Sequence, residues 1–436
     1  MDKPLQELIK NIKSKKLNLA VVGLGYVGFP LALAFADKRI RVVGIEIDQN
    51  RLSQIQRGQS YISDISSASL SKALRRGFFT ASGNFNEVEN ADAVLICVPT
   101  PLKRRYLPDI SFIKSAVKSV ALHLKKGALV ILESTTYPGT TQEEILPIFE
   151  NQGFKHGRDF FLCFSPERID PGNKNFPVHK IPKVIGGVSP LATRLAMEVY
   201  KIILEQVVPV SSPRAAETVK LLENTFRLIN IGLIDELSMM AHRMKIDIWE
   251  VIAAASTKPF GFMPFYPGPG VGGHCIPKDP LYLHWKAKRF GFNSRFIKLA
   301  SDVINDMPNY IVARIKNVLE ERGVDFKTSK ILILGVTYKK DVKDLRKSPS
   351  LDVIKSLKRQ HIRVAYSDPL IPFLRLEGLD LESVALTAGN LKKFDCCLIA
   401  TDHSGVDYAL VLKCSRFIFD ARNIYKGQYL NKVKRL

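Results

Sequence analysis

The sequence lacks the cysteine spacing of a disulfide framework or of a structural zinc site. Its 436 residues include only six cysteines, and no two of them form a C-x-x-C pair. In a chain of this size, that pattern is typical of free thiols in a reducing compartment. We therefore expect neither a disulfide scaffold nor a bound metal.

Long uninterrupted apolar runs are also missing. Residues 17–36 come closest, because they are nearly all apolar, follow Lys15 and Lys16, and end in Ala-Phe-Ala like a signal peptide or a short membrane span. They nevertheless hold three glycines and a proline, and charge resumes at Asp37. We interpret the segment as part of a folded domain and predict no membrane association.

Acidic residues are scarce. Lys and Arg number 64 against 42 Asp and Glu, which leaves a formal charge of +22. Such an excess favours anionic partners, namely nucleic acid, an anionic membrane or phosphorylated small molecules. No run reaches five like charges, so a basic arm for nucleic acid is not indicated, whereas a folded basic patch stays open. The share of hydrophobic residues, 46%, excludes wholesale disorder, and the length predicts about three domains.

A dinucleotide-binding pattern opens the folded chain. Residues 18–23 predict a buried strand, Gly23-x-Gly25-x-x-Gly28 follows it, and residues 29–36 predict a buried helix. In this pattern the first glycine allows the turn, the second lets a pyrophosphate approach the backbone, and the third lets the helix pack on the strand. The helix N-terminus adds N–H groups and a positive dipole for that pyrophosphate.

An acid at the end of the next strand selects the nucleotide. Residues 41–46 predict that strand, and Glu46 at its end would accept hydrogen bonds from ribose hydroxyls and repel a 2′-phosphate. The sequence therefore favours NAD over NADP. Asp48 is a rival acid, but its position suits a solvated loop better.

The alternation of strands and helices continues along the chain. Four further apolar strands are predicted, at residues 93–98, 129–132, 160–164 and 184–187. Helical patterns between them indicate a parallel sheet, whose ligands lie beyond the carboxyl ends of the strands. The segments at those ends contain Thr100, Thr135 and Glu167.

The middle of the chain predicts one long helix, residues 213–243, with Ser212 as its N-cap. Its length would be about 45 Å at 1.5 Å per residue. A polar stripe follows helical spacing along it, made of Glu217, Lys220, Asn224 and Arg227. Periodicity alone favours a solvated face, and a catalytic face turned into a cleft is the alternative.

A loop rich in glycine and proline then leads to Cys275. Glycine at this density lets the backbone approach a ligand closely, and a thiolate is a strong nucleophile. Cys275 is thus a candidate nucleophile, although free cysteines are often small buried apolar residues. His274 and Asp279 suggest a metal site with Cys275, but the lack of a second ligand pair argues against it.

The C-terminal part predicts a second α/β unit, with strands at residues 331–334, 363–366, 396–400 and 417–420. The glycine fingerprint is absent there, but a basic loop with Lys339 and Arg346 suits a phosphate. The predicted fold class is α/β. Two Rossmann-like parallel-sheet domains, residues 1–210 and 311–436, are joined by a helical middle domain, residues 211–310, that holds the long helix.

Seven motifs occur in a fixed order along residues 17–425. They are Gly23-x-Gly25-x-x-Gly28, Val98-Pro99-Thr100-Pro101, Ser134-Thr135-x-x-Pro138-Gly139, Ser165-Pro166-Glu167, Lys220-x-x-x-Asn224, Gly272-Gly273-x-Cys275-x-x-Lys278-Asp279 and Lys339-x-Asp341-x-x-Asp344-x-Arg346. In this combination the chain resembles the UDP-glucose/GDP-mannose dehydrogenase family of nucleotide-sugar 6-dehydrogenases.

The resemblance implies that the sugar C6 alcohol is oxidised twice, to a carboxylate, while two NAD molecules are reduced. Cys275 would be the nucleophile that traps the aldehyde as a thiohemiacetal, which a second hydride transfer converts to a thioester. Lys220 and Asn224 would stabilise the oxyanion, and Asp279 would order a water and Lys220.

The resemblance implies further site residues. Glu167 would assist thioester hydrolysis, and Thr135 would bind a water near the nicotinamide. Cofactor contacts would come from Gly23, Gly25, Tyr26, Val27, Gly28, Glu46, Pro99, Thr100, Thr135 and Arg346. Substrate contacts would come from Glu167, Arg168, Lys220, Asn224, Phe265, Tyr266, Gly272 and Lys339.

One position departs from the UDP-glucose dehydrogenases. Those enzymes typically carry a second glutamate four residues after the Pro-Glu glutamate, where this chain has Pro171. Residues 165–173 and 264–275 look instead like the branch that acts on N-acetylamino sugars. The predicted substrate is UDP-N-acetylglucosamine, for surface polysaccharide synthesis. The alternatives are UDP-N-acetylgalactosamine, UDP-N-acetylmannosamine and UDP-glucose.

The resemblance also implies partners. The family is cytoplasmic, and it forms dimers or larger homo-oligomers with the long helix in the dimer core. We therefore expect a UDP-sugar and a second copy of the chain as partners, but neither nucleic acid nor membrane. A non-catalytic regulatory protein that binds nucleotide sugars is the alternative from another class, and the intact set of Lys220, Asn224, Cys275 and Asp279 argues against it. Residues 1–16 have no assigned role and suit a basic helix.

Overall fold

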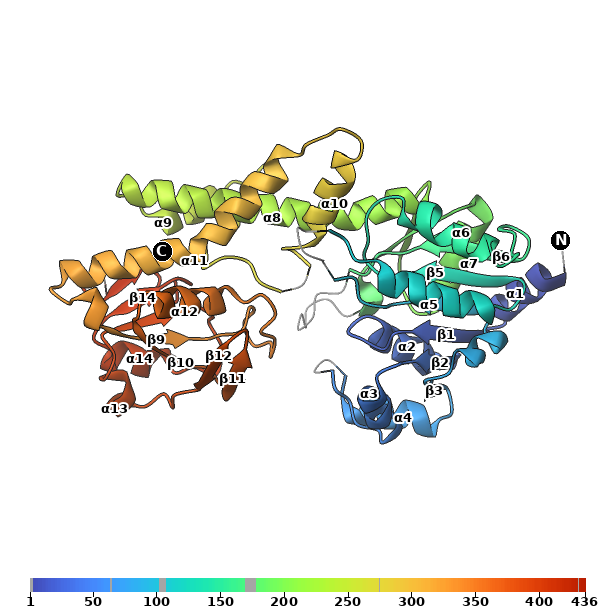
Figure 1. The fold of residues 1–436 in the computed structure, drawn as a ribbon, viewed down its shortest axis with the longest axis horizontal. Helices are drawn as coiled ribbons and strands as arrows, with labels where there is room; N and C mark the ends of the chain where they lie inside the picture. The colour runs from blue at the N-terminus through green and yellow to red at the C-terminus, as the bar shows by residue number, and fades with distance from the viewer. Residues whose placement is uncertain (1–2, 63–64, 102–106, 169–177, 274, 430) are drawn as a thin grey trace. The chain divides into compact units, whose positions relative to one another are not determined.

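The computed structural model describes residues 3–62, 65–101, 107–168, 178–273, 275–429 and 431–436. The chain divides into two compact units. The first unit comprises residues 1–223 and 285–291, and the second comprises residues 224–284 and 292–436. Each unit contains a sheet of its own with helices on its faces (Figure 1), so the α/β fold class predicted from the sequence is confirmed.

The first unit is built on an eight-stranded sheet with the order β3-β2-β1-β4-β5-β6-β7-β8. The strands are β1 Asn18–Val22, β2 Arg41–Ile45, β3 Phe79–Ser82, β4 Ala93–Ile96, β5 Ala128–Leu132, β6 Phe160–Phe164, β7 Lys183–Gly187 and β8 Val207–Pro209. The order reverses between β1 and β4, which creates the crevice where doubly wound sheets bind ligands.

One strand pair departs from the wholly parallel sheet that the sequence predicts. β7 runs antiparallel to β6, while the other neighbours in this sheet are parallel. A parallel connection needs a crossover of a dozen or more residues, usually a helix. Between β6 and β7 the described residues form only the 3₁₀ turn Val178–Lys180.

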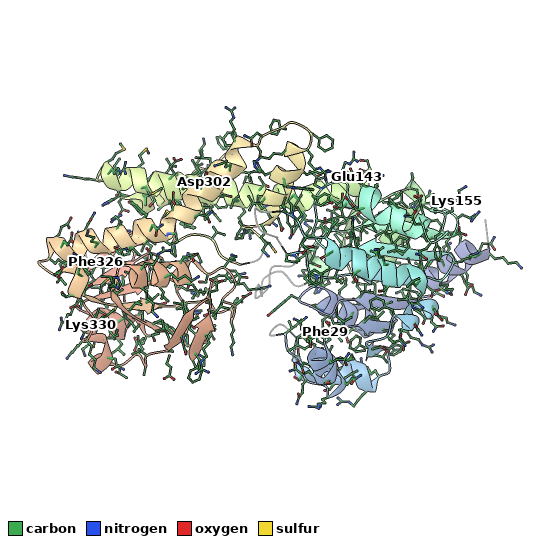
Figure 2. The ribbon with its side chains drawn as sticks, in the orientation of Figure 1. Phe29, Glu143, Lys155, Asp302, Phe326 and Lys330 are labelled. Atoms are coloured by element: carbon green, nitrogen blue, oxygen red, sulfur yellow. The ribbon has the colours of Figure 1, made fainter. Side chains whose placement is uncertain are left out.

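Helices cover both faces of this sheet, because its strands are buried on both sides. In the described part of the first unit they are α1 Lys3–Lys13, α2 Gly28–Asp37, α3 Gln49–Gln56, α4 Ser67–Arg75, α5 Ser111–Leu122, α6 Leu146–Glu150 and α7 Pro190–Tyr200. Phe29 of α2 illustrates the packing (Figure 2), since its ring centre lies 5.9 Å from that of Phe79 and both side chains are buried.

The N-terminal residues belong to the fold of this unit. Helix α1 buries Leu5, Leu8 and Ile12, and the Asn11 amide donates to Asp92 at 3.2 Å. Residues 17–36, which carry the apolar run, form β1, the glycine turn and α2, as the sequence predicts. In the ranges that the structure describes, no helix is both long and apolar enough to cross a membrane.

Helix α8, Pro213–Arg243, contributes residues to both units. The Ser212 hydroxyl accepts the Ala215 N–H at 3.2 Å, which confirms Ser212 as the N-cap. Within the second unit, Gly232 lies so close to helix α11, Arg295–Glu321, that a Cβ there would be 2.9 Å from the Ala300 Cα.

The second unit carries a five-stranded sheet with the order β10-β9-β13-β14-β15, all parallel. The strands are β9 Lys330–Leu334, β10 Arg363–Ser367, β13 Cys396–Ile399, β14 Ile418–Asp420 and β15 Val433–Arg435, and β11 Phe373–Leu376 pairs with β12 Leu379–Glu382 in a separate hairpin. The remaining helices are α9 Ile248–Ala255, α10 Asp279–Lys288, which ends in residues of the first unit, α12 Pro349–Arg359, α13 Ala388–Leu391 and α14 Tyr408–Cys414. Phe326, labelled in Figure 2, is buried in a hydrophobic core that includes side chains of β9. The three-domain division stays a prediction beside these two units.

A buried carboxyl group in the second unit makes its stability depend on pH. Asp235 of α8 accepts the Gly268 N–H through Oδ1 at 3.1 Å, while Oδ2 has no hydrogen-bond partner among the described residues. Burial raises the pKa of Asp235 from 3.8 to about 8. Since the folded state then binds the proton more tightly, stability is greatest below pH 4 for this group and falls as the pH rises towards 8.

We predict that Asp235→Asn removes this loss. The amide keeps an oxygen for the Gly268 N–H but carries no charge at any pH, so its melting temperature at pH 8 should exceed that of the wild type by roughly 2–4 °C. Melting curves between pH 5 and 8 measure the effect. Asp306→Asn, at an exposed site on α11, is the control. Identical pH profiles for the wild type and Asp235→Asn would contradict the prediction.

Candidate active site

The three glycines of the first turn have different surroundings. Gly23 has φ +91°, and a Cβ there would lie 2.8 Å from the Cys97 carbonyl oxygen. A Cβ on Gly28 would lie 2.0 Å from the Gly23 oxygen, whereas one on Gly25 would meet nothing within 4 Å. Gly23 and Gly28 are therefore required by the fold, while Gly25 leaves open space against the backbone. That space is where the fingerprint places a pyrophosphate.

The acid predicted to hold the ribose is buried at the same turn. Glu46 accepts the Leu24 N–H at 3.3 Å and the Asp48 N–H at 3.1 Å. Asp48 has another task, since its side chain accepts the N–H groups of Asn50 and Arg51 and so caps α3. The open backbone at Gly25 and the carboxylate beside Leu24 together fit NAD.

Polar groups join the carboxyl ends of β4 and β5. The Ser134 hydroxyl donates to the Val98 carbonyl at 2.8 Å, so the segment with Pro99 and Thr100 is tied to the one with Thr135. Thr100 is buried and Thr135 half-buried. The structure thus brings these predicted cofactor residues to one edge of the sheet, next to the glycine turn that Cys97 contacts.

Helix α8 positions the loop after β5. Glu217 accepts the Gly139 N–H at 2.5 Å, and its other oxygen accepts both the N–H and the hydroxyl of Thr141 at 2.8 and 2.7 Å. Burial raises the pKa of Glu217 to about 7 despite these hydrogen bonds. Sequence reasoning placed Glu217 in the polar stripe but gave it no role.

Most of that stripe is buried. Glu217, Lys220 and Asn224 are each less than 10% exposed, and only Arg227 is exposed. The solvated face that periodicity favours is therefore wrong, because three of the four polar side chains point into protein. The Lys220 ammonium has no hydrogen-bond or ion-pair partner in the described ranges, so it can bind an oxyanion.

The nucleophile candidate lies at the start of α10. The Cys275 carbonyl accepts the N–H groups of Lys278 at 3.0 Å and Asp279 at 2.8 Å. Asp279 is buried and accepts the Asn224 amide at 2.5 Å, so one hydrogen bond links the Cys275 turn to the α8 stripe. Cys275 itself is exposed, unlike a buried structural cysteine.

Positive charge surrounds this turn in the second unit. The Gly273 N–H donates to the Arg346 carbonyl at 2.8 Å, and a Cβ on Gly272 would lie 2.5 Å from that of Tyr338. Burial lowers the pKa of Lys278, and the charges of Lys347 and Arg346 lower it further. Because the positive charges of Lys347 and Arg346 act on Lys278 in this turn, the turn suits an anionic ligand. The Arg346 guanidinium also pairs with Asp344 at 2.6 Å.

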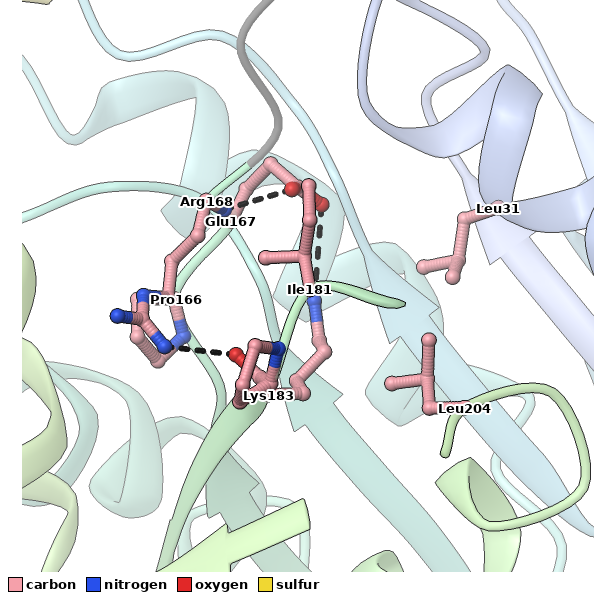
Figure 3. Close-up of a pocket in the computed structure, with 8 residues that line it drawn as sticks. Leu31, Pro166, Glu167, Arg168, Ile181, Lys183 and Leu204 are labelled. Atoms are coloured by element: carbon pink, nitrogen blue, oxygen red, sulfur yellow. Dashed lines mark hydrogen bonds and ion pairs between the residues drawn. The ribbon is translucent and has the colours of Figure 1, made fainter. Parts of the chain in front are cut away.

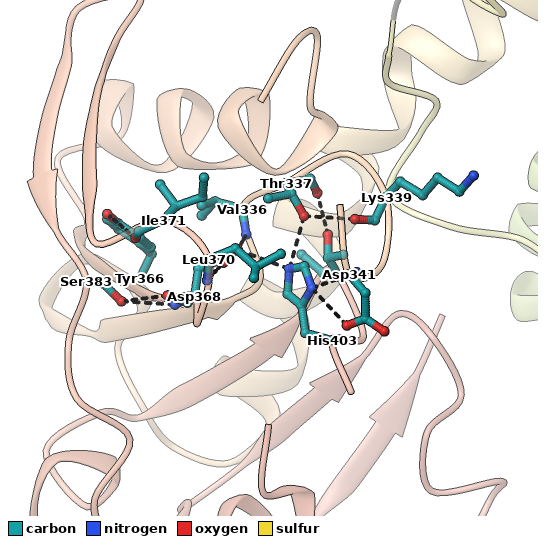
Figure 4. A network of polar contacts seen from close by, with 12 residues as sticks. Val336, Thr337, Lys339, Asp341, Tyr366, Asp368, Leu370, Ile371, Ser383 and His403 are labelled. Carbon is teal, nitrogen blue, oxygen red and sulfur yellow. Dashed lines mark hydrogen bonds and ion pairs between the residues drawn. The ribbon is translucent and has the colours of Figure 1, made fainter. Parts of the chain in front are cut away.

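A buried histidine holds the loop that carries Lys339 (Figure 4). The Asp341 N–H donates to His403 Nδ1 at 2.9 Å, so Nε2 carries the proton and faces Asp368 at 3.2 Å and Thr337 at 3.0 Å. The Thr337 hydroxyl in turn donates to the Lys339 carbonyl at 3.0 Å. Although burial opposes ionisation of Asp368, hydrogen bonds from His403 and from backbone N–H groups hold its pKa below the usual value. The Lys339 side chain extends away from this network.

The remaining predicted substrate residues lie in both units. Phe265 contacts Phe226 edge-on at 5.8 Å between ring centres, and the half-exposed Tyr266 stacks on Trp249 at 6.0 Å. In the first unit, the Arg168 guanidinium pairs with Glu223 at 2.7 Å. His274 and Pro171 lie outside the described residues.

Sequence reasoning did not identify the buried residues that contact and position predicted site residues. Lys183 forms ion pairs with Glu133 at 2.5 Å and Glu167 at 3.6 Å, and His403 orders the Lys339 loop. Lys183 and His403 lie far along the chain from the motif residues that they contact, so motif spacing does not predict their roles. Only Glu133, which directly precedes the Ser-Thr motif at the end of β5, could have been suspected.

We predict opposite outcomes for alanine at two of the glycines. Gly28→Ala should lower the melting temperature, because its Cβ would clash with the Gly23 carbonyl. Gly25→Ala should keep the melting temperature but weaken NAD binding at least about tenfold, since its Cβ would occupy the space left for the pyrophosphate. Calorimetric titration with NAD and thermal melting measure both. Unchanged NAD affinity in Gly25→Ala would refute the assignment of that space.

Comparison with known proteins agrees with this geometry. Models of the UDP-glucose/GDP-mannose dehydrogenase family match the chain with an NAD binding domain at residues 17–204, a central domain at 214–306 and a UDP binding domain at 332–427. The chain is 39% identical to UDP-N-acetyl-D-glucosamine 6-dehydrogenase of Pseudomonas aeruginosa over 360 residues, which cover 82% of this chain and 84% of that protein.

Two further relatives match over greater lengths. UDP-N-acetyl-D-mannosamine dehydrogenase of Escherichia coli K12 is 35% identical over 399 residues, 88% of this chain and 93% of that protein. A solved structure of UDP-D-ManNAc dehydrogenase from Pyrococcus horikoshii superposes with a TM-score of 0.87 at 31% identity, covering 96% of this chain and 99% of that one. With the glycine turn, Glu46 and the UDP binding domain in place, the chain belongs to the UDP-glucose/GDP-mannose dehydrogenase family and is an NAD-dependent oxidoreductase of nucleotide sugars.

Proposed function

We propose that the chain oxidises the C6 alcohol of a UDP-N-acetylhexosamine to the carboxylate in two steps, with UDP-N-acetylglucosamine as its substrate. When bound, NAD supplies the hydride acceptor for both oxidations. The observation that carries the proposal is the buried hydrogen bond between Asn224 and Asp279 at 2.5 Å, because within the second unit it joins the turn that presents Cys275 to Asn224, one of the two oxyanion donors.

In the first oxidation C6 loses a hydride and its hydroxyl loses a proton. The Lys220 ammonium and the Asn224 amide, one helical turn apart, donate hydrogen bonds to the oxygen as negative charge develops there. Burial of both side chains strengthens this interaction, since the local dielectric constant is lower than in water. The product of this step is the C6 aldehyde.

The second oxidation passes through Cys275. Its thiolate forms a bond to the aldehyde carbon, and the oxygen takes up a proton to give a thiohemiacetal. Loss of a hydride and a proton then leaves the thioester. Exposure of Cys275 and the cations around its turn favour this role, because the nucleophile has to be a thiolate and to reach the substrate.

Hydrolysis releases the acid. Glu167 takes a proton from water as the water oxygen bonds to the thioester carbon, and the C–S bond then breaks to return the Cys275 thiolate. Asp279 orders the water and Lys220, and Thr135 binds a water near the nicotinamide. Over the whole reaction one alcohol, two NAD and one water give one carboxylate, two NADH and three protons.

Basic residues of the second unit bind the UDP group. Lys339, on the loop that His403 fixes, pairs with the substrate, and Arg346 contacts the NAD pyrophosphate. Arg168, Phe265, Tyr266 and the close-packed Gly272 complete the substrate contacts.

A homodimer would cover the exposed apolar side chains of α8, which are Leu222, Phe226, Leu233 and Met240.

The choice of sugar rests on sequence likeness. The Pseudomonas aeruginosa relative, at 39% identity, is named for UDP-N-acetylglucosamine, and the others described above are named for the manno epimer. Pro171 argues against UDP-glucose.

We predict that the purified protein reduces two NAD per UDP-N-acetylglucosamine consumed. NADH absorbance at 340 nm should be followed with UDP-N-acetylglucosamine, its galacto and manno epimers and UDP-glucose, and the products identified by mass. The fastest of the N-acetylated sugars names the substrate. Turnover of UDP-glucose alone would overturn the N-acetylhexosamine assignment, and no turnover of any of the four sugars would overturn the proposed activity.

Cys275→Ser should lower acid production at least about 10³-fold, because the weaker nucleophile cannot form the thioester. NAD affinity should stay unchanged, since the glycine turn is intact. Cys414→Ser, at a half-buried cysteine of α14, is the matched control and should keep full activity. Acid production by Cys275→Ser at the wild-type rate would sink the role given to this thiol.

A further inference from the structure

Glu167 contacts Lys183 (Figure 3), and Lys183 belongs to a buried polar cluster at the carboxyl edge of the first sheet. The Lys183 ammonium lies between two carboxylates, 2.5 Å from an oxygen of Glu133 and 3.6 Å from one of Glu167. Tyr200, at the end of α7, donates its hydroxyl to the other oxygen of Glu133. Its ring centre lies 5.1 Å from the Lys183 ammonium.

The antiparallel pairing of β7 explains this arrangement. Phe164 of β6 pairs with Gly186 of β7, and continuing that register by three residues sets Glu167 opposite Lys183. Glu133 follows the end of the neighbouring β5 directly. The two acids therefore come from adjacent strand ends, and the lysine comes from the start of the strand that runs the other way.

Three members of the cluster are almost fully buried, and the fourth, Glu167, is slightly more exposed. Glu133, Lys183 and Tyr200 are each less than 8% exposed, so their positions are fixed by one another. The Glu167 side chain is 12% exposed, and it lines a small cavity together with Lys183, Leu31 and Leu204. One Glu167 oxygen also accepts the Arg168 N–H at 2.6 Å.

Opposite charges within the cluster affect the pKa values of Glu133 and Lys183. Burial works against the charged form of Lys183, but the carboxylates of Glu133 and Glu167 outweigh it and raise its pKa. Burial raises the pKa of Glu133, which Lys183 partly opposes. Lys183 thus forms its closer ion pair with Glu133 and a second, longer one with Glu167.

We propose that Lys183 is a positioning residue for the hydrolytic step: anchored by Glu133 and Tyr200, its ammonium holds the Glu167 carboxylate in one orientation. This rests on the proposed function, in which Glu167 takes the proton of the attacking water. Without the cation, both oxidations still occur and the acyl bond to Cys275 still forms. Attack of water on the thioester then slows, so the acyl enzyme accumulates.

Lys183→Met tests the proposal, because it keeps the length of the side chain and removes its charge. Rapid mixing with NAD and UDP-N-acetylglucosamine should give a burst of about two NADH per site, followed by a steady-state rate roughly 10- to 100-fold below that of the wild type. Intact-protein mass spectrometry should show the sugar acyl adduct. Lys183→Arg, which keeps a cation at this position, should restore turnover.

Three further variants separate this role from a purely structural one. Lys183→Met leaves Glu133 buried without its cation, so the double variant Lys183→Met/Glu133→Gln removes both charges and preserves folding. Glu167→Gln provides the reference for blocked hydrolysis. Lys125→Met is the matched control, because Lys125 makes a similar ion pair with Asp92 at 2.9 Å in the same unit, away from Glu167.

The outcomes distinguish the possible failures. The proposal is supported if the sugar acyl adduct accumulates in Glu167→Gln and in the double variant, but not in Lys125→Met. Adduct in Glu167→Gln alone, with wild-type hydrolysis in the double variant, overturns the role of Lys183 and leaves the proposed function standing. A wild type that reduces no NAD with any UDP-sugar, or a Glu167→Gln variant that hydrolyses normally, overturns the step on which the proposal rests.

Discussion

Two buried carboxyl groups of this protein have hydrogen-bond or ion-pair partners within the chain, and an unpaired buried charge would be strongly destabilising. Glu217 satisfies the N–H groups of the loop after β5, and Glu133 is neutralised by Lys183. Removing one partner of such a pair typically costs about 3–5 kcal/mol, much of the stability of a folded domain. The loops at the sheet edge are therefore fixed by the same hydrogen bonds that keep the acids buried.

Three polar side chains of helix α8 are buried on one of its faces. Glu217, Lys220 and Asn224 are spaced three and four residues apart, so they share one face of a helix that cannot shift one of them without the others. Glu217 anchors that face to Gly139 and Thr141, and Asn224 anchors it to Asp279. Lys220 lies between Glu217 and Asn224 on this face of the helix.

Local patterns could be read from the sequence, and long-range pairings could not. The strand-turn-helix at Gly23, the acid Glu46 and the glycine-rich loop before Cys275 follow from residues near one another in the chain, and the structure has all three. Lys183 escaped notice because its role depends on β7 running antiparallel to β6, which no local pattern encodes. The burial of the α8 stripe was hidden for a similar reason, since a polar periodicity looks the same whether water or protein faces it.

The imidazole of His403 has a consequence for observing the protein. With Nδ1 accepting a backbone N–H and Nε2 directed at a carboxylate, the ring is held in one tautomer and sealed from solvent. Its ring nitrogens should therefore give separate, sharp nitrogen-15 resonances, distinguishable from those of solvent-exposed histidines that exchange between tautomers. The same ring supports the Lys339 loop through Thr337. Those resonances should therefore report the binding of a ligand to that loop.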